Sequence, residues 1–278
     1  MSENKLRRIW LVADDYGISL SVNAAIRDLI VRRRINAASV MVAAPSFSGA
    51  EAAALREAAG GHAAIGLHLT LTGPFRPLSP NFAPLRRGVF PPLTSMARRA
   101  LLRSLKPAVL DAEMLSQFAA FRSAFGRAPD YVDGHQHIHV FPVVSEALIR
   151  VTEHAAPGAW LRQCGRAERA RKSLADPKAL ILDRLSARLR KLAAQHGVPT
   201  NPAFAGTYSF RRDADYAKLF PGFLDALPDG GVVMCHPGKV DAELARLDPL
   251  TDLREREYAF FGAESFPHLL AECGYALA

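Results

Sequence analysis

The chain has 278 residues, of which 49% are hydrophobic and 22% charged, with 19 Gly and 19 Pro. This composition is that of an ordinary globular protein, so it excludes collagen-like, disordered and low-complexity chains. Lys and Arg outnumber Asp and Glu by 35 to 27, which gives a formal net charge of +8. Three cysteines, Cys164, Cys235 and Cys273, are too few for a disulfide framework, so we expect a reduced, cytoplasmic setting.

Most of the excess positive charge lies in one segment. Between residues 162 and 191 there are ten Lys or Arg and three acids. Because the rest of the chain is close to neutral, we expect no nucleic-acid partner. No apolar run approaches the ~18 residues that a transmembrane helix needs, so neither export nor a membrane anchor is expected.

Short apolar segments alternate with helical patterns along the chain. The patterns predict strands at residues 8–13, 37–43, 64–71, 131–140, 159–163, 204–206 and 231–235. They predict helices at about residues 22–30, 47–57, 110–125, 143–154, 174–194, 214–227, 251–261 and 264–273. The alternation indicates one α/β domain over residues 1–278, in which helices cover about seven parallel strands. It does not separate an open sheet from a closed barrel.

Two segments stand apart from this pattern. Residues 72–95 are rich in Pro, so we expect a long loop insertion there. Two acids rather than a Gly-rich loop follow the first strand, which removes the usual dinucleotide-binding signature.

Polar residues stand at the ends of several predicted strands. Asp14 and Asp15 directly follow the first strand, His68 lies near the end of the third, and His236 follows the strand at 231–235. Because the carboxyl ends of parallel strands open onto one face, we expect these side chains to converge. The plainer alternatives are a helix-capping or turn acid for each Asp, a core histidine at position 68 and a turn histidine at position 236.

Three histidines, His135, His137 and His139, lie within five residues. On a strand all three share a face, and on a helix the first and the last do. Either geometry is expected to bring His135 and His139 together. Asp133, two residues earlier, can orient a ligating imidazole. The alternative is that the three histidines are surface residues without a function.

One Asp and two His make an open three-ligand metal site with room for water and a substrate oxygen. A metal in such a site lowers the pKa of bound water and polarises a carbonyl. A second Asp can take the proton of the water, and a histidine across the site can protonate a leaving amine. These parts predict metal-dependent hydrolysis of an amide or ester.

The phrases LVADDYGIS, GLHLTLTG, VDGHQHIHVFP and MCHPG follow one another in this order along the chain. They resemble the motifs of the YdjC-like carbohydrate deacetylases, and LREREY resembles the closing motif of that family. The resemblance implies an irregular, TIM-like (β/α) barrel. It also implies a metal-dependent hydrolase that removes the acetyl group from an N-acetylated sugar.

The resemblance further implies roles for individual residues. It makes Asp15, His68 and His135 the metal ligands, Asp14 the catalytic base and His236 the acid. It places Arg162 and His139 against the substrate. The metal that it implies is Mg²⁺, whereas two imidazoles suit Zn²⁺, Mn²⁺ or Co²⁺ better.

Other functions stay open at this point. The chain is also compatible with another amidohydrolase or a phosphoesterase on the same barrel, or with a sugar- or metal-binding protein without turnover. Asp14 argues against pure binding, because a binder needs no base beside its metal. We expect the basic helical segment at about residues 164–195 to form a rim for an anionic or lipid-linked glycan, with a solvated helix face as the alternative. A homodimer is compatible with the sequence.

Overall fold

The computed structural model describes residues 6–167, 177–211 and 213–278. Its strands are β1 (Arg7–Tyr16), β2 (Ala37–Val40), β3 (Ala64–Leu69), β4 (Tyr131–Gly134), β5 (Trp160–Leu161), β6 (Phe204–Ala205), β7 (Gly231–Cys235) and β8 (Tyr275–Leu277). They form one sheet in the order β5-β4-β3-β2-β1-β7-β6, and β8 pairs with β1. The pairings are parallel.

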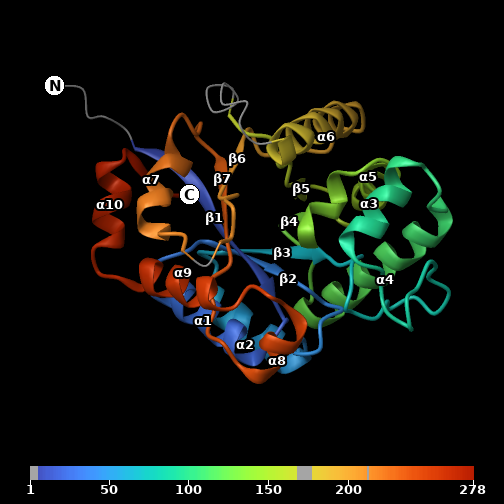
Figure 1. Cartoon of the computed structure of the whole chain (residues 1–278), viewed down its shortest axis with the longest axis horizontal. Helices are drawn as coiled ribbons and strands as arrows, with labels where there is room; N and C mark the ends of the chain where they lie inside the picture. Colours follow the sequence, from blue (N-terminus) through green and yellow to red (C-terminus); the bar gives the residue numbers. More distant parts are fainter. Residues whose placement is uncertain (1–5, 168–176, 212) are drawn as a thin grey trace.

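The sheet curls into a half-barrel that helices flank (Figure 1). In the described part of the chain no strand pairing joins the two ends of the sheet, β5 and β6. The predicted α/β class with about seven parallel strands is therefore confirmed, but the TIM-like barrel is open. β8 was not predicted, because its three residues are too short to show a pattern.

The helices are α1 (Leu20–Val31), α2 (Gly49–Ala59), α3 (Leu93–Leu101), α4 (Pro107–Phe125), α5 (Val144–Ala155), α6 (Pro177–Gln195), α7 (Tyr216–Leu224), α8 (Ala242–Leu247), α9 (Asp252–Gly262) and α10 (Phe266–Glu272). Two short helices, α3 and α8, were not predicted, and α3 begins inside the expected loop at residues 72–95. The predicted basic helix corresponds to α6, and its first residues, 174–176, lie outside the described residues. In the described part, no helix is both long and apolar enough to cross a membrane.

The central strands are buried on both faces because helices cover the sheet. Every residue of β7 is buried, and so is β1 from Leu11 to Tyr16. Such continuous burial is typical of parallel sheets and explains why these segments are nearly unbroken apolar runs. The two carboxylates at the end of β1, Asp14 and Asp15, are buried with the rest of that strand end.

The predicted strand at residues 131–140 is wrong beyond Gly134. The chain turns there into a 3₁₀ segment, η1 (His135–Val140), in which Gln136 and His137 take left-handed φ angles of 54° and 57°. Two such residues in succession break the strand alternation. The three histidines consequently point to different partners.

The long loop before α3 is tied to α4 by a buried acid. Glu113, which is fully buried, accepts hydrogen bonds from the backbone N–H groups of Leu78 (3.1 Å) and Ser79 (2.7 Å). Gln117 donates to Glu113 (2.8 Å) and also to the carbonyl oxygen of Thr70 (2.7 Å), just after β3. Burial raises the pKa of Glu113, although these hydrogen bonds oppose the shift. One helix face thus fixes the loop and the end of a strand together.

Replacing Glu113 with Ala is expected to lower the free energy of unfolding by about 1–3 kcal/mol, because the buried N–H of Ser79 and the part-buried N–H of Leu78 lose their acceptor. Urea denaturation measures this loss, and faster proteolysis within residues 72–92 reports the freed loop. Ser116→Ala, at a half-buried position on the same helix, is the control and should shift stability by less than about 0.5 kcal/mol. Equal stability of the two variants would contradict the anchoring role.

Candidate metal centre and active site

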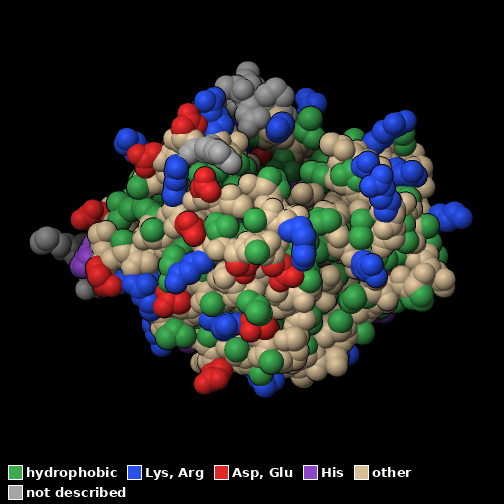
Figure 2. Space-filling model, turned by 60° about the horizontal axis from the view of Figure 1, so that its bottom comes forward, with side chains coloured by type: hydrophobic (Ala, Val, Ile, Leu, Met, Phe, Trp, Pro, Cys, Tyr) green, Lys and Arg blue, Asp and Glu red, His purple; other side chains and the backbone are tan. Residues whose placement is uncertain are grey.

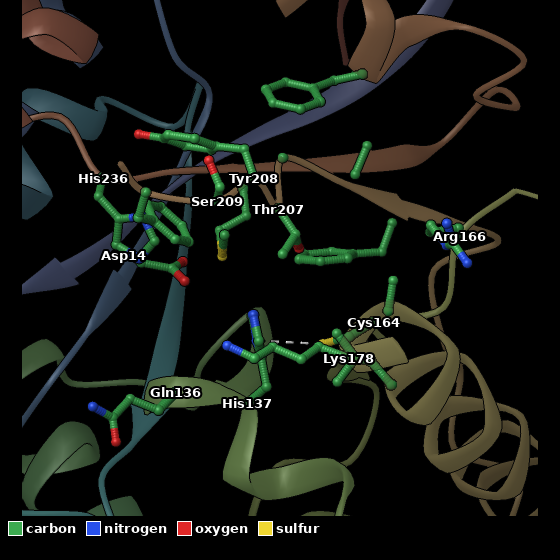
Figure 3. A pocket seen from close by; sticks show the side chains of 18 of the residues that line it. Asp14, Gln136, His137, Cys164, Arg166, Lys178, Thr207, Tyr208, Ser209 and His236 are labelled. Atoms are coloured by element: carbon green, nitrogen blue, oxygen red, sulfur yellow. Dashed lines mark hydrogen bonds between the residues drawn. The ribbon is translucent and has the colours of Figure 1, made fainter. Parts of the chain in front are cut away.

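A pocket of about 1210 Å³ opens at the carboxyl ends of the strands. Asp14, Asp15, His135 and His236 line one part of it, and they come from the ends of β1, β4 and β7. In Figure 3, Asp14 and His236 lie together on one side, while His137 lies across the pocket from them. The strand-end residues predicted from the sequence thus meet at one face of the sheet.

The backbone of β1 is distorted where its two acids stand. Asp15 has a left-handed φ of 69°, and the pairing of β1 with β2 shifts register between Ala13 and Tyr16. This conformation is uncommon for residues other than Gly, although Asp tolerates it better than most. It lets two consecutive carboxylates reach different partners, and such strain is frequent at functional sites.

Three buried side chains form a candidate metal centre. Asp15 Oδ1 lies 3.0 Å from His135 Nδ1 and 3.3 Å from His68 Nε2. One donor atom from each residue lies within 4.8 Å of those of the other two. Segments that are far apart in the sequence therefore bring one carboxylate and two imidazoles to a common point.

His68 is held in the orientation that a ligand needs. Its Nδ1–H donates to Asp133 Oδ1 at 2.6 Å, and Ser39 Oγ donates to the other oxygen of Asp133 at 2.6 Å. Burial would lower the pKa of His68, but Asp133 and Asp14 raise it to about 10. The Asp133 contact leaves Nε2 directed at Asp15, which is the usual carboxylate–histidine arrangement behind a metal.

Asp14 is held by a buried arginine. Arg162, which follows β5, donates to both oxygens of Asp14, each at 2.7 Å, and lies 3.0 Å from an oxygen of Asp133. Its side chain is fully buried and does not line the pocket. In place of the expected contact with the substrate, Arg162 pairs with the carboxylates of Asp14 and Asp133.

A second group of possible metal donors contains Asp14, His68 and Asp133. The guanidinium of Arg162 contacts both of these carboxylates, so a cation placed there would face a fixed positive charge. Arg254 also pairs with Asp15, but through Oδ2. Oδ1 of Asp15, the atom that faces both imidazoles, has no arginine partner among the described residues, so the Asp15 group is the better metal centre of the two.

The remaining histidines of η1 lie outside the metal centre. His139 is fully buried, and its Nε2–H donates to the carbonyl oxygen of Arg162 at 2.7 Å. It supports the end of β5 and does not line the pocket, which differs from the expected substrate contact. His137 does line the pocket, with Nδ1 3.6 Å from Cys164 Sγ. Burial and the charge of Arg162 lower the pKa of His137 well below its usual value.

His236 lies at the edge of this centre. Its Nε2 is 4.0 Å from Asp15 Oδ2, and its ring packs edge-on against Phe210 at 5.7 Å. Burial lowers the pKa of His236, with Asp15 opposing the shift. Once protonated, this imidazole is a stronger proton donor than free imidazole.

Two buried charged residues of α9 were missed by the sequence analysis. Arg254 donates to Asp15 Oδ2 at 2.6 Å and to Asp248 Oδ2 at 2.8 Å, and Glu257 contacts the backbone of His236. Burial would raise the pKa of Asp15, but Arg254 and His135 hold it well below its usual range. The available signal was a charged pair three residues apart on a helix that also buries Leu253 and Phe261.

Comparison with known proteins places these residues in a family. A family model described as YdjC-like protein matches residues 8–272. The chain is 29% identical over 276 residues to a chitooligosaccharide deacetylase of Proteus mirabilis, across 95% of this chain and 94% of the relative. It is 28% identical over 273 residues to a carbohydrate deacetylase of Geobacillus stearothermophilus, across 95% of this chain and 93% of the relative.

A solved structure shares the fold. It is an Enterococcus faecalis protein whose proposed role is cellobiose-phosphate cleavage, and it matches with a TM-score of 0.70 and 19% identity. The match covers 98% of this chain and 97% of the other. The family match spans all the strands that carry the centre and continues through α9, so the resemblance seen in the sequence is confirmed and the chain belongs to the YdjC-like family.

Proposed function

We propose that this protein is a metal-dependent hydrolase that removes the acetyl group from an N-acetylated carbohydrate. The observation that carries the proposal is that two adjacent carboxylates have different partners. Asp15 meets His68 and His135 as a metal ligand would, while Asp14 beside it stays outside that group. The relatives named chitooligosaccharide and carbohydrate deacetylases support the substrate class.

The donor set fits a single divalent metal. Asp15, His68 and His135 would hold it and leave positions for water and a substrate oxygen. When bound, the metal would polarise the acetyl carbonyl and make water more acidic. The orientation of His68 by Asp133 supports this fit. Family resemblance favours Mg²⁺, whereas two imidazoles favour Zn²⁺, Mn²⁺ or Co²⁺.

The other residues act on protons. Asp14 has both oxygens bound by Arg162, so its carboxylate has a fixed orientation and keeps further lone pairs for a proton from water. His236 lies on the same wall of the pocket and would give a proton to the departing amine. A base on one strand can thus act on the water that attacks the amide carbon, while an acid on another strand acts on the amide nitrogen.

Metal analysis combined with an acetate-release screen tests this function. The panel contains chitooligosaccharides, acetylated glucosaminides and a lipid-linked acetylglucosamine. We expect acetate release that chelation abolishes and one divalent metal restores. Bound metal without acetate release from any substrate would favour a binding protein, and phosphate release from phosphoesters would favour a phosphoesterase.

In the described part of the basic segment, Arg166 and Lys178 are the basic side chains that line the pocket. On α6 the pocket is lined by Lys178, Ala179, Ile181, Leu182 and Leu185, without Arg184, Arg188 or Lys191. Arg188 instead donates to Ser145 Oγ on α5 at 3.0 Å. On the face shown in Figure 2, Lys and Arg side chains occur across the molecule, whereas Asp and Glu lie mainly on its left and central parts.

We therefore expect the combined replacement of Arg184, Arg188 and Lys191 with Gln to leave kcat/KM unchanged on neutral substrates, because these side chains do not line the pocket. Steady-state acetate release on neutral and anionic acetylated sugars measures this. A loss confined to anionic substrates would support the rim hypothesis for this helix, and no loss on any substrate would remove it.

A further inference from the structure

We propose that Glu257 of α9 is a positioning residue that fixes His236 and Tyr208 against the pocket. The proposal rests on the proposed function, in which His236 gives a proton to the leaving amine. Glu257 does not line the pocket itself, so it would act only through the two residues that it holds.

The contacts of Glu257 join the ends of two neighbouring strands. Its side chain is 1% exposed. One oxygen accepts the backbone N–H of His236 at 2.5 Å, directly after β7. The other accepts the hydroxyl of Tyr208 at 2.7 Å, in the segment after β6. Both donor residues line the pocket, so one carboxylate sets the position of two parts of its wall.

The imidazole of His236 has little else to orient it. Its Nδ1 is buried and has no hydrogen-bond partner in the described part of the chain, whereas catalytic histidines are usually held through that second nitrogen. Its Nε2 is 4.0 Å from Asp15, which is beyond hydrogen-bond distance. The orientation of the ring must therefore come from its backbone and from packing against Phe210.

α9 holds that backbone at two points. Besides the bond from His236 to Glu257, the N–H of Gly238 donates to the carbonyl oxygen of Arg254 at 3.1 Å. Pro237 between them has no N–H and a fixed φ. Space is also limited, because a Cβ at Gly238 would lie 2.9 Å from Val22. The turn that carries His236 is thus packed between α1 and α9, and Glu257 of α9 binds the first residue of the turn, His236.

Only an ionised carboxylate satisfies both donors that face Glu257, because it accepts at each oxygen and donates at neither. A Gln at this position would turn its NH₂ group toward one of the two donors. Burial raises the pKa of Glu257 to about 7, although the bonds from His236 and Tyr208 and the charge of Arg254 oppose the shift. The fold keeps this acid in a buried site in spite of that cost, which supports a role beyond packing.

The test compares an amide with an ester in Glu257→Gln. The amide is an N-acetylated sugar that the wild type hydrolyses, and the ester is 4-nitrophenyl acetate, whose leaving group departs without a proton. We expect kcat on the amide to fall by about 10²-fold, the scale of a mispositioned general acid, with KM and the ester rate unchanged. Glu255→Gln is the matched control, since Glu255 is exposed on the same helix and accepts the N–H of Val240.

His236→Ala is the reference that separates the two proposals. A selective loss of amide turnover in this variant establishes the acid, and the Glu257 proposal is then overturned if Glu257→Gln loses both activities alike or neither. If His236→Ala spares the amide, the acid assignment fails and the positioning role falls with it. Should circular dichroism show Glu257→Gln to be unfolded, Glu257→Asp, which keeps the charge on a shorter side chain, provides the same comparison.

A double variant supplies a rescue. With Tyr208→Phe added to Glu257→Gln, the amide oxygen of Gln can accept from His236 without a second donor facing its NH₂ group. Amide turnover should then recover in part relative to Glu257→Gln alone. Further loss would show that Tyr208 acts independently of Glu257 and would contradict the proposed linkage.

Discussion

Replacement of Asp14 with Asn is expected to lower kcat by at least about 10²-fold while the metal content stays unchanged. Asn retains one acceptor oxygen for Arg162 but loses the carboxylate that takes a proton. The proposed ligands Asp15, His68 and His135 are not altered, so the metal should remain. Acetate release gives kcat, and metal analysis after dialysis gives the occupancy.

Asp111→Asn is the control for this change. Asp111 is also paired with an arginine, Arg150 at 3.0 Å, but it lies on α4 outside the pocket. It should leave kcat unchanged. Full activity in Asp14→Asn would show that the base is assigned wrongly. Loss of metal together with activity would place Asp14 among the ligands, as its group with His68 and Asp133 would allow.

Arg162→Met is expected to lower the free energy of unfolding by about 3–5 kcal/mol. Arg162 is fully buried and pairs with Asp14 and Asp133, so its removal leaves two buried carboxylates without their cation. Met preserves much of the side-chain volume, and the loss therefore reports charge rather than a cavity. Denaturant unfolding followed by circular dichroism measures it.

Two comparisons sharpen this prediction. Arg150→Met breaks the partly exposed pair with Asp111 and should cost less than about 1 kcal/mol. Adding Asp14→Asn to Arg162→Met removes one of the stranded charges and should restore part of the lost stability. Equal losses for the two arginines would contradict the view that Arg162 neutralises the site.

Much of the architecture could be predicted from local pattern. The apolar runs that became β1, β3 and β7 are buried on both faces, and the polar residues that follow them meet because parallel strands end on one side. This reasoning needs only the type of each element. It was therefore enough to predict that acids and histidines converge at the strand ends, whereas the choice of Asp15, His68 and His135 as one set came from the family resemblance.

Features set by tertiary contact could not be predicted in this way. The strand pattern of YVDGHQHIHV continues past Gly134, and nothing in it announces the two left-handed residues that turn the chain into η1. Arg254 and Glu257 look like solvent-facing charges on a polar helix, and only their contacts with Asp15 and His236 explain their burial. The substrate contact expected of Arg162 came from the family resemblance, and sequence spacing does not reveal that Asp14 and Asp133 pair with this arginine.

Because β5 and β6 are the two ends of an open sheet, the parts of the chain that build the pocket differ in how much change they tolerate. Asp15 and His68 lie on β1 and β3, inside the sheet, and His135 directly follows β4. The segment that carries α6 runs from β5 to β6, the two ends of the sheet, and in its described part an isolated bridge between Leu161 and Thr200 ties it to β5. Changes at the pocket-lining positions of α6, such as Ile181, Leu182 and Leu185, can reshape what the pocket admits and leave the contact of Arg162 with Asp14 in place. A designer who wants a new substrate should diversify residues there and leave the central strands alone.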